Sequence, residues 1–138
     1  MKPLSQLCHP RPSVFDPKKR ATLLDLHDLV SNRIDPGEFF AENFVTEGMK
    51  VLLHQGFLRL EGKSDQGIFL LRQAMGGGKT HSLLALGLLA KHPDLRASIL
   101  HGIHTPESTL GPVTVVAFSG RESDAPLGIW GAIAEQLG

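Results

Sequence analysis

The chain has 138 residues, of which 41% are hydrophobic and 20% charged, and this composition fits one folded domain rather than a disordered tail. Lysine and arginine total 14, as do aspartate and glutamate, so the formal net charge is zero. This balance excludes a long-range field that draws the whole chain to nucleic acid, although it leaves room for a local basic patch. Acidic residues flank the run Lys18-Lys19-Arg20, which we interpret as the solvated start of a helix.

Cys8 is the only cysteine, so no internal disulfide can form, as is usual in a reducing compartment. Residues 1–12 lack the apolar run of a signal peptide. The most apolar stretch, residues 83–90, is far too short to span a bilayer. We therefore expect a cytoplasmic protein that has no membrane partner.

The first third of the chain reads as an arm followed by helices. Four prolines among residues 1–20 predict an extended arm or loop, because proline lacks an N–H donor and disfavours helix before it. Leucines at helical spacing predict a helix over residues 22–30. Asp35 is placed to cap a short helix that begins at Pro36 and continues over residues 38–43. We expect this helix to expose Phe39 and Phe40 to a neighbour.

A longer helix should follow. Thr46 has the character of an N-cap, and Glu47 lies in the first turn, where the helix dipole favours an anion. Apolar residues from Met49 to Leu60 form the stripe of a helix that packs on a core. Gly56 inside this helix predicts a close approach by another backbone.

The second half predicts alternating strands and helices. The apolar run 68–71 has the signature of a strand buried on both faces, and residues 79–91 form a largely apolar helix. A shorter helix over 94–100 and a loop over 101–112 come next. The β-branched run 113–118 predicts a second strand, and a helix over 127–137 follows.

This order of elements predicts an α/β fold. Residues 63–138 would be the N-terminal part of a phosphate-loop (P-loop) nucleotide-binding domain, with parallel strands and flanking helices. Residues 1–62 would precede it as an N-terminal arm and helical region.

Three consecutive glycines, Gly76 to Gly78, separate the first predicted strand from its helix, and Lys79 and Thr80 follow them. Glycines let backbone N–H groups approach a polyanion, and the helix N-terminus adds further donors. The lysine supplies a charge for the β and γ phosphates, and the hydroxyl can coordinate Mg²⁺. We therefore expect ATP and Mg²⁺ as cofactors, catalytic roles for Lys79 and Thr80, and a metal-binding role for Thr80. The residues expected to hold the nucleotide are Ala74, Met75, Gly76, Gly77, Gly78, Lys79, Thr80 and His81.

The loop is a variant, because the usual spacing G-x-x-x-x-G-K-[ST] places a glycine where this chain has Gln73. Phosphate binding depends mainly on the later residues, so the assignment holds. The alternative is a glycine-rich turn that binds no ligand.

Other polar residues are weaker candidates. His101 and His104 have the spacing of a metal-binding pair, with surface-loop histidines as the favoured alternative. Arg121 and Glu122 follow the second predicted strand and can reach the γ-phosphate side, with a solvated loop pair as the alternative. For His81, the alternative to a phosphate contact is an ordinary residue of the first helical turn.

Hydrolysis also requires an acidic residue that holds magnesium and a group that positions water. The second predicted strand has no carboxylate before Glu122, and we expect the magnesium-linked residue beyond Gly138. These 138 residues are therefore expected to be the N-terminal portion of a longer ATPase.

Several stretches resemble a family of large bacterial and archaeal P-loop ATPases that carry a domain of unknown function. Some of its members are encoded beside DNA methyltransferases in phage-defence clusters. The resemblance covers nearly the whole chain but only the N-terminal part of a typical member. It implies AAA-like ATPase activity in the complete protein, with antiviral defence or remodelling of DNA or a partner protein as its output. The most specific string is Gln73-Ala74-Met75-Gly76-Gly77-Gly78-Lys79-Thr80-His81, supported by segments 14–17, 33–36, 38–43, 46–50, 67–71 and 116–118 and by Trp130.

Three functions remain open at this point. The first is an ATPase that depends on the longer protein. The second is a regulatory or assembly module that binds nucleotide without hydrolysis, acting through self-association, partner ATPase subunits or a DNA-modifying partner. The third is a truncated product without activity, whose unpaired strand at residues 113–118 promotes aggregation.

Overall fold

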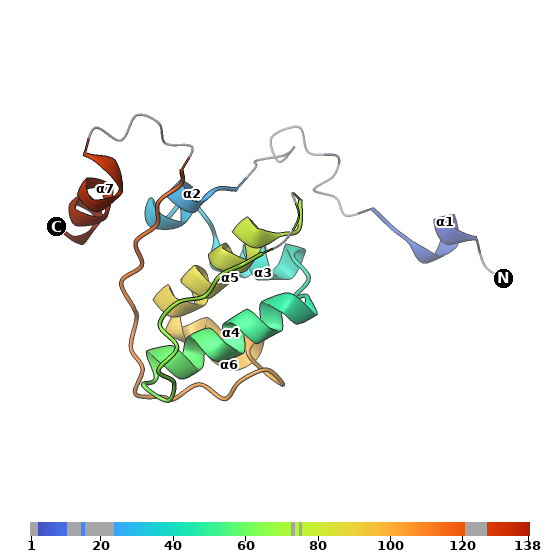
Figure 1. The fold of residues 1–138 in the computed structure, drawn as a ribbon. Helices are drawn as coiled ribbons and strands as arrows, with labels where there is room; N and C mark the ends of the chain where they lie inside the picture. Colours follow the sequence, from blue (N-terminus) through green and yellow to red (C-terminus); the bar gives the residue numbers. More distant parts are fainter. Residues whose placement is uncertain (1–2, 11–14, 16–23, 73, 75, 121–126) are drawn as a thin grey trace.

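A computed structural model describes residues 3–10, 15, 24–72, 74, 76–120 and 127–138, and these residues are helical or irregular. Figure 1 shows α5 among the other helices of the central part, while α1 and α7 stand apart from it. The short helix α1 lies within the segment that the prolines predict to be an extended arm. The helices are α1 (Leu4–Leu7), α2 (Leu26–Val30), α3 (Pro36–Glu42), α4 (Glu47–Leu60), α5 (Lys79–Lys91), α6 (Pro93–Ile99) and α7 (Gly128–Leu137).

The starts of α3 and α4 follow from their capping residues. The Asp35 carboxylate accepts a hydrogen bond from the Glu38 N–H at 2.7 Å, and Pro36 occupies the first turn. The Thr46 hydroxyl accepts one from the Met49 N–H at 3.3 Å. Each side chain satisfies a backbone donor that the helix itself leaves unpaired, so both predicted N-caps are found in the structure.

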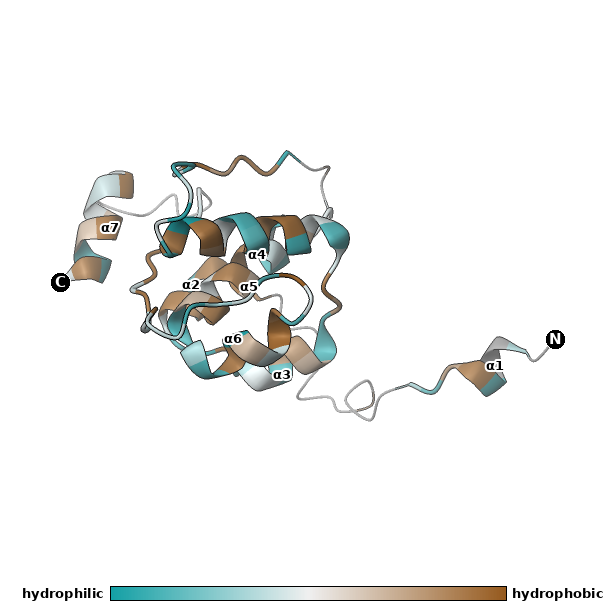
Figure 2. Ribbon diagram, turned by 90° about the horizontal axis from the view of Figure 1, so that it is seen from below, coloured by the Kyte–Doolittle hydropathy of each residue, from teal (hydrophilic) through white to brown (hydrophobic). Residues whose placement is uncertain are grey.

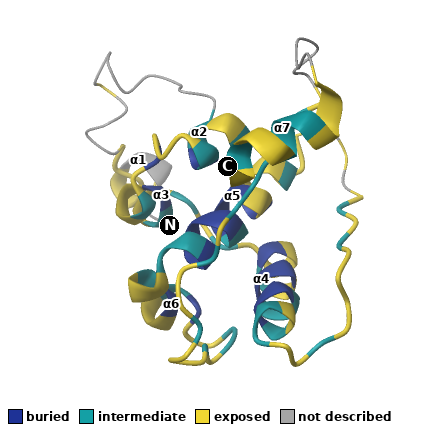
Figure 3. Cartoon of the chain, turned by 90° about the vertical axis from the view of Figure 1, so that its left-hand side faces the viewer, coloured by how far each residue is buried: buried dark blue, intermediate teal, exposed yellow. Residues whose placement is uncertain are grey.

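The core forms around α5, which packs against α2, α4 and α6. Figure 2 shows α5 as predominantly hydrophobic, and Figure 3 shows buried residues along α5 and on one side of α4. Burial of each large aliphatic or aromatic side chain stabilises the fold by about 1.5–3 kcal/mol relative to exposure. The largest fully buried side chains are Phe57, Leu53, Leu84, Leu89 and Leu100.

Two glycines bring the helices close together. A Cβ added at Gly56 would lie 2.8 Å from Leu86 Cδ1, and one added at Gly87 would overlap the end of the Leu29 side chain. The close approach predicted at Gly56 is therefore present, although it is made by a side chain of α5 rather than by a backbone. Small residues at both crossings allow α2 and α4 to pack tightly on α5.

Arg96 joins the end of α5 to the segment after α6. Its side chain is buried and lies over the Phe57 ring, with 5.4 Å between Cζ and the ring centroid. Burial lowers its pKa, and the charge of Glu61 offsets part of this effect. The guanidinium donates to four backbone carbonyl groups, those of Leu89, Ala90, Leu110 and Gly111. The bonds to Leu89 O and Ala90 O satisfy carbonyls at the end of α5, because the last carbonyls of a helix have no N–H partner within the helix.

The predicted α/β fold is wrong for the described residues, which contain no β-strand and no sheet. The run 68–71 has no regular secondary structure, and Ile68 and Leu70 are 86% and 70% exposed rather than buried. Residues 113–118 also have no regular secondary structure. The prediction of parallel strands with flanking helices is therefore corrected to a helical fold.

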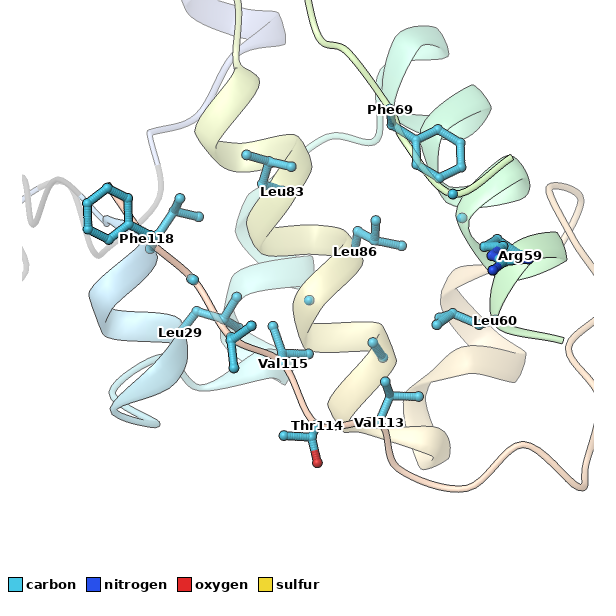
Figure 4. A pocket seen from close by; sticks show the side chains of 17 residues that line it. Leu29, Arg59, Leu60, Phe69, Leu83, Leu86, Val113, Thr114, Val115 and Phe118 are labelled. Carbon is cyan, nitrogen blue, oxygen red and sulfur yellow. The ribbon is translucent and has the colours of Figure 1, made fainter. Parts of the chain in front are cut away.

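The physical reason is the absence of a pairing partner. Figure 4 shows Phe69 on one side and Val113, Val115 and Phe118 on the other, with Leu83 and Leu86 of α5 between them. Among the described residues, 67–72 make no backbone–backbone hydrogen bond. A run of residues with high β-propensity becomes a strand only where another backbone lies beside it.

Residues of α5 and α7 form hydrogen bonds with the backbone of residues 113–118. The Val113 N–H donates to Ala90 O at 2.9 Å. The Gln136 side chain of α7 accepts from the Ala117 N–H at 2.8 Å and donates to Ala117 O at 2.9 Å. These bonds hold residues 113–118 against helices instead of against a second strand.

No helix in the described part of the chain has the length and apolarity needed to cross a membrane.

Candidate phosphate-binding site

The predicted phosphate loop leads directly into α5, which is 13 residues long. Gly76 has φ +80° and Gly78 φ +76°, a backbone region that glycine adopts without steric cost. The Gly77 N–H donates to Ala74 O at 3.0 Å and closes a turn. The glycines therefore allow a tight turn of the chain immediately before a helix, as the sequence predicts.

Several donors at this turn are unpaired. Among the described residues, the N–H groups of Gly78, Thr80 and His81 have no backbone acceptor, and no side chain caps the start of α5. The first intrahelical acceptor is Gly78 O, which receives the Ser82 N–H at 2.9 Å and the Ser82 hydroxyl at 3.0 Å. Unpaired N–H groups at a helix N-terminus, together with the helix dipole, form an environment that favours an anion.

The two side chains with predicted catalytic roles lie at this turn. The Lys79 ammonium donates to Ala74 O at 3.0 Å, so it reaches back over the loop. Thr80 is exposed, which leaves its hydroxyl accessible from solvent. The cation and the hydroxyl therefore both lie at the turn that leads into α5.

His81 links this turn to α3. Its ring stacks on Phe39, with 6.1 Å between the centroids and an interplanar angle of 24°. Phe40 meets Phe39 edge-on at 5.1 Å. Phe39 is buried, so the prediction that both phenylalanines are exposed to a neighbour is wrong for this residue. No pattern in the sequence indicates the contact between Phe39 and His81, because the two residues are 42 positions apart.

The two histidines predicted as a weaker metal site have different surroundings. His101 is exposed, whereas the His104 side chain is 5% exposed and its Nε2 lies 2.9 Å from Glu61 Oε1. Among the described residues, no three His, Cys, Asp or Glu side chains are grouped so that they could hold a metal ion. The alternative is that both are surface-loop histidines. The exposure of His101 agrees with it, and the burial of the His104 side chain does not.

Glu61 is the centre of a cluster that the sequence does not reveal. Its buried carboxylate receives hydrogen bonds from Lys63 Nζ, His104 and the Glu107 N–H, each at 2.9 Å. Burial is the largest influence and raises the pKa, but these hydrogen bonds together outweigh it and lower the pKa of Glu61 to about 2. Lys63 also pairs with Glu107 at 2.7 Å. The cluster fastens the segment after α6 to the end of α4 and lies apart from the phosphate loop in sequence.

Some predicted positions lie outside the described residues. These are Gln73 and Met75 of the loop and the pair Arg121 and Glu122. The described members of the predicted nucleotide-binding set lie in the loop and the first turn of α5: Ala74, Gly76, Gly77, Gly78, Lys79, Thr80 and His81.

A separate apolar groove of about 690 Å³ crosses the outer face of α5 (Figure 4). Leu83 and Leu86 form its floor, and residues 113–118 form one side. Its lining is mainly apolar and contains no residue of the phosphate loop, so we assign it no part in the nucleotide site.

Comparison with known proteins gives one match. The family model for the DUF499 N-terminal domain matches residues 12–107, which is more than half of the chain. No curated protein and no solved structure matches the chain.

Proposed function

The chain belongs to the DUF499 N-terminal domain family, and we propose that it binds the phosphates of ATP, with Mg²⁺, at the turn before α5. The observation that carries this proposal is the set of unpaired N–H groups of Gly78, Thr80 and His81 at the start of a 13-residue helix. Such donors hold a phosphate group without requiring a pre-formed side-chain cage.

The roles of the side chains follow from their positions. Under this proposal, the Lys79 ammonium, which donates to Ala74 O in the structure, contacts the β and γ phosphates when the nucleotide binds. The Thr80 hydroxyl takes one place in the coordination of Mg²⁺. Ala74, Gly76 and Gly77 shape the turn, and Met75 belongs to the same loop by sequence.

ATP hydrolysis is proposed only for a longer protein that contains this chain. It requires an acidic residue for magnesium and a group that positions water, and the loop supplies neither. The resemblance to ATPases encoded in phage-defence clusters supports hydrolysis, and it supports a cytoplasmic role in antiviral defence. Under this proposal, Lys79 and Thr80 contribute to catalysis by stabilising charge on the phosphates.

A second function, nucleotide binding that switches a partner without hydrolysis, is supported by the contact between His81 and Phe39. This contact joins the first turn of α5 to α3. A phosphate group that moves His81 would therefore change the surroundings of a buried residue on another helix.

The test is a fluorescence titration of the chain with an ATP analogue that carries a fluorophore, in the presence and absence of Mg²⁺. We expect saturable binding that Lys79→Ala weakens at least about tenfold, because a charge-assisted contact is lost. Lys50→Ala is the matched control, since Lys50 lies on α4 and pairs with Glu47. Thr80→Val should reduce the effect of Mg²⁺ more than binding in its absence.

Circular dichroism of each variant establishes that the protein is folded before affinities are compared. Equal binding by the Lys79→Ala and Lys50→Ala variants would contradict the site, as would the absence of binding in the folded parent chain. Turnover measured on the longer protein then separates an ATPase from a non-hydrolysing module.

A further inference from the structure

A second pocket, which we call the Arg33 pocket, lies at the opposite end of α5 from the phosphate loop. It has a volume of about 460 Å³, within the range of small-molecule sites. Its apolar lining comes from Leu29, Ile34 and Leu88, and its basic residues are Arg33, Lys91 and His92. The 13 residues of α5 separate it from the loop by about 18 Å, at 1.5 Å per residue.

The end of α2 sets the position of Arg33. Asn32 has φ +54°, and the Arg33 N–H donates to Asp28 O at 2.9 Å. A residue in the left-handed conformation, followed by a residue whose N–H donates to a carbonyl of the helix, forms the Schellman motif that ends many helices. It turns the chain so that Arg33 follows α2 directly at the pocket.

Lys91 holds the two sides of the pocket together. Its ammonium, from the last turn of α5, donates to Leu29 O at 2.9 Å and to Asn32 Oδ1 at 2.6 Å. Both acceptors are uncharged, and no carboxylate of a residue that the structure describes pairs with this cation. Because the contact joins residues about sixty positions apart, it also fixes the pocket as part of the folded core.

The lining of the Arg33 pocket has more basic than acidic side chains. The Arg33 guanidinium makes no hydrogen bond or ion pair with any residue that the structure describes. Asp35 is the acidic residue of the lining, and its carboxylate already receives the Glu38 N–H at 2.7 Å. The lining therefore contains two cations and the His92 imidazole, against one carboxylate that already accepts a hydrogen bond.

We propose that the Arg33 pocket binds a small organic anion, whose carboxylate or phosphate group contacts Arg33 and His92. The apolar part of that ligand lies against Leu29, Ile34 and Leu88. A guanidinium presents paired N–H donors that match both kinds of oxyanion. This site shares no residue with the phosphate loop, so binding at the two places can be followed separately.

Nuclear magnetic resonance titration of the ¹⁵N-labelled chain tests the proposal with three probes: hexanoate, inorganic phosphate and the uncharged analogue 1-hexanol. We expect hexanoate to shift the amide signals of Arg33, Ile34 and His92 saturably, with weaker binding of 1-hexanol. Phosphate alone should shift the same signals if the oxyanion dominates recognition. The signals of Gly76 and Gly78 report separately on the phosphate loop, so failure at one site is distinguished from failure at the other.

Arg33→Gln should weaken hexanoate binding about tenfold, whereas Arg33→Lys should retain part of the affinity. Arg59→Gln is the control, because Arg59 is an exposed arginine on α4 outside the pocket. Dispersed amide signals in each spectrum establish that the variant is folded. The proposal fails if hexanoate leaves the pocket signals unchanged, if 1-hexanol binds as tightly, or if both glutamine variants lose affinity equally.

Discussion

His104 Nε2 lies 2.9 Å from Glu61 Oε1, and this contact joins the segment after α6 to the end of α4. The carboxylate is fully buried, and the imidazole is nearly so. A buried carboxylate is stable as an anion only when donors surround it. Lys63 and the Glu107 N–H complete that set, which makes Glu61 a structural anchor with a strong dependence on pH.

The first prediction concerns acid stability. The pKa of Glu61 is lowered from 4.5 to about 2, so its contribution is fully present above about pH 4.5 and is lost as the pH falls toward 2. This shift corresponds to about 3 kcal/mol. Urea denaturation between pH 6 and 2 should show the loss, and Glu61→Gln should flatten it. Glu47→Gln, at an exposed carboxylate, should leave the pH profile unchanged.

The second prediction compares two glycines at helix crossings. Gly87→Ala should destabilise the fold by about 1–3 kcal/mol, because its Cβ overlaps Leu29, which is 2% exposed and has little room to move. Gly56→Ala meets the end of Leu86, which is only partly buried and borders the groove. There the gain of about 1 kcal/mol in helix propensity should offset much of the clash. Chemical denaturation of both variants gives the comparison, and equal losses would contradict it.

The third prediction concerns Arg96. Replacement by methionine removes the donor to four backbone carbonyls while keeping an apolar side chain near Phe57. We expect a loss of at least about 3 kcal/mol in the free energy of unfolding, because buried acceptors are left unpaired. Arg59→Met, at an exposed arginine with one bond to Ser64 O, should cost far less. Similar losses for the two variants would show that the buried hydrogen bonds contribute little.

The fourth prediction concerns the phosphate loop. Gly78→Ala creates no contact within 4 Å, but its φ of +76° costs about 1–2 kcal/mol for a residue with a Cβ. We expect weaker ATP-analogue binding, because relief of this strain reorients the N–H groups. Gly111→Ala also meets nothing within 4 Å and lacks the positive φ, so it serves as the control. Thermal denaturation and fluorescence titration measure the two effects, and unchanged binding by Gly78→Ala would argue against a role for the turn geometry.

Local signals in the sequence predicted much of the secondary structure. Asp35 and Thr46 mark helix starts because each supplies an oxygen to an N–H group three positions later. The glycines before Lys79 predicted a turn into a helix, and their positive φ values agree with it. Each of these features depends on residues that are neighbours along the chain, so the sequence alone contained the necessary information.

Only the tertiary structure decided which segments meet. The runs 68–71 and 113–118 have the composition of strands, yet they lie on either side of Leu83 and Leu86 and do not pair with one another (Figure 4). Pairing is a relation between distant segments, which the β-propensity of either run does not specify. The same holds for the contact between Glu61 and His104, which are 43 positions apart. Local chemistry therefore determined the turn, the caps and most helices, while packing around α5 determined the absence of a sheet and the positions of the buried charges.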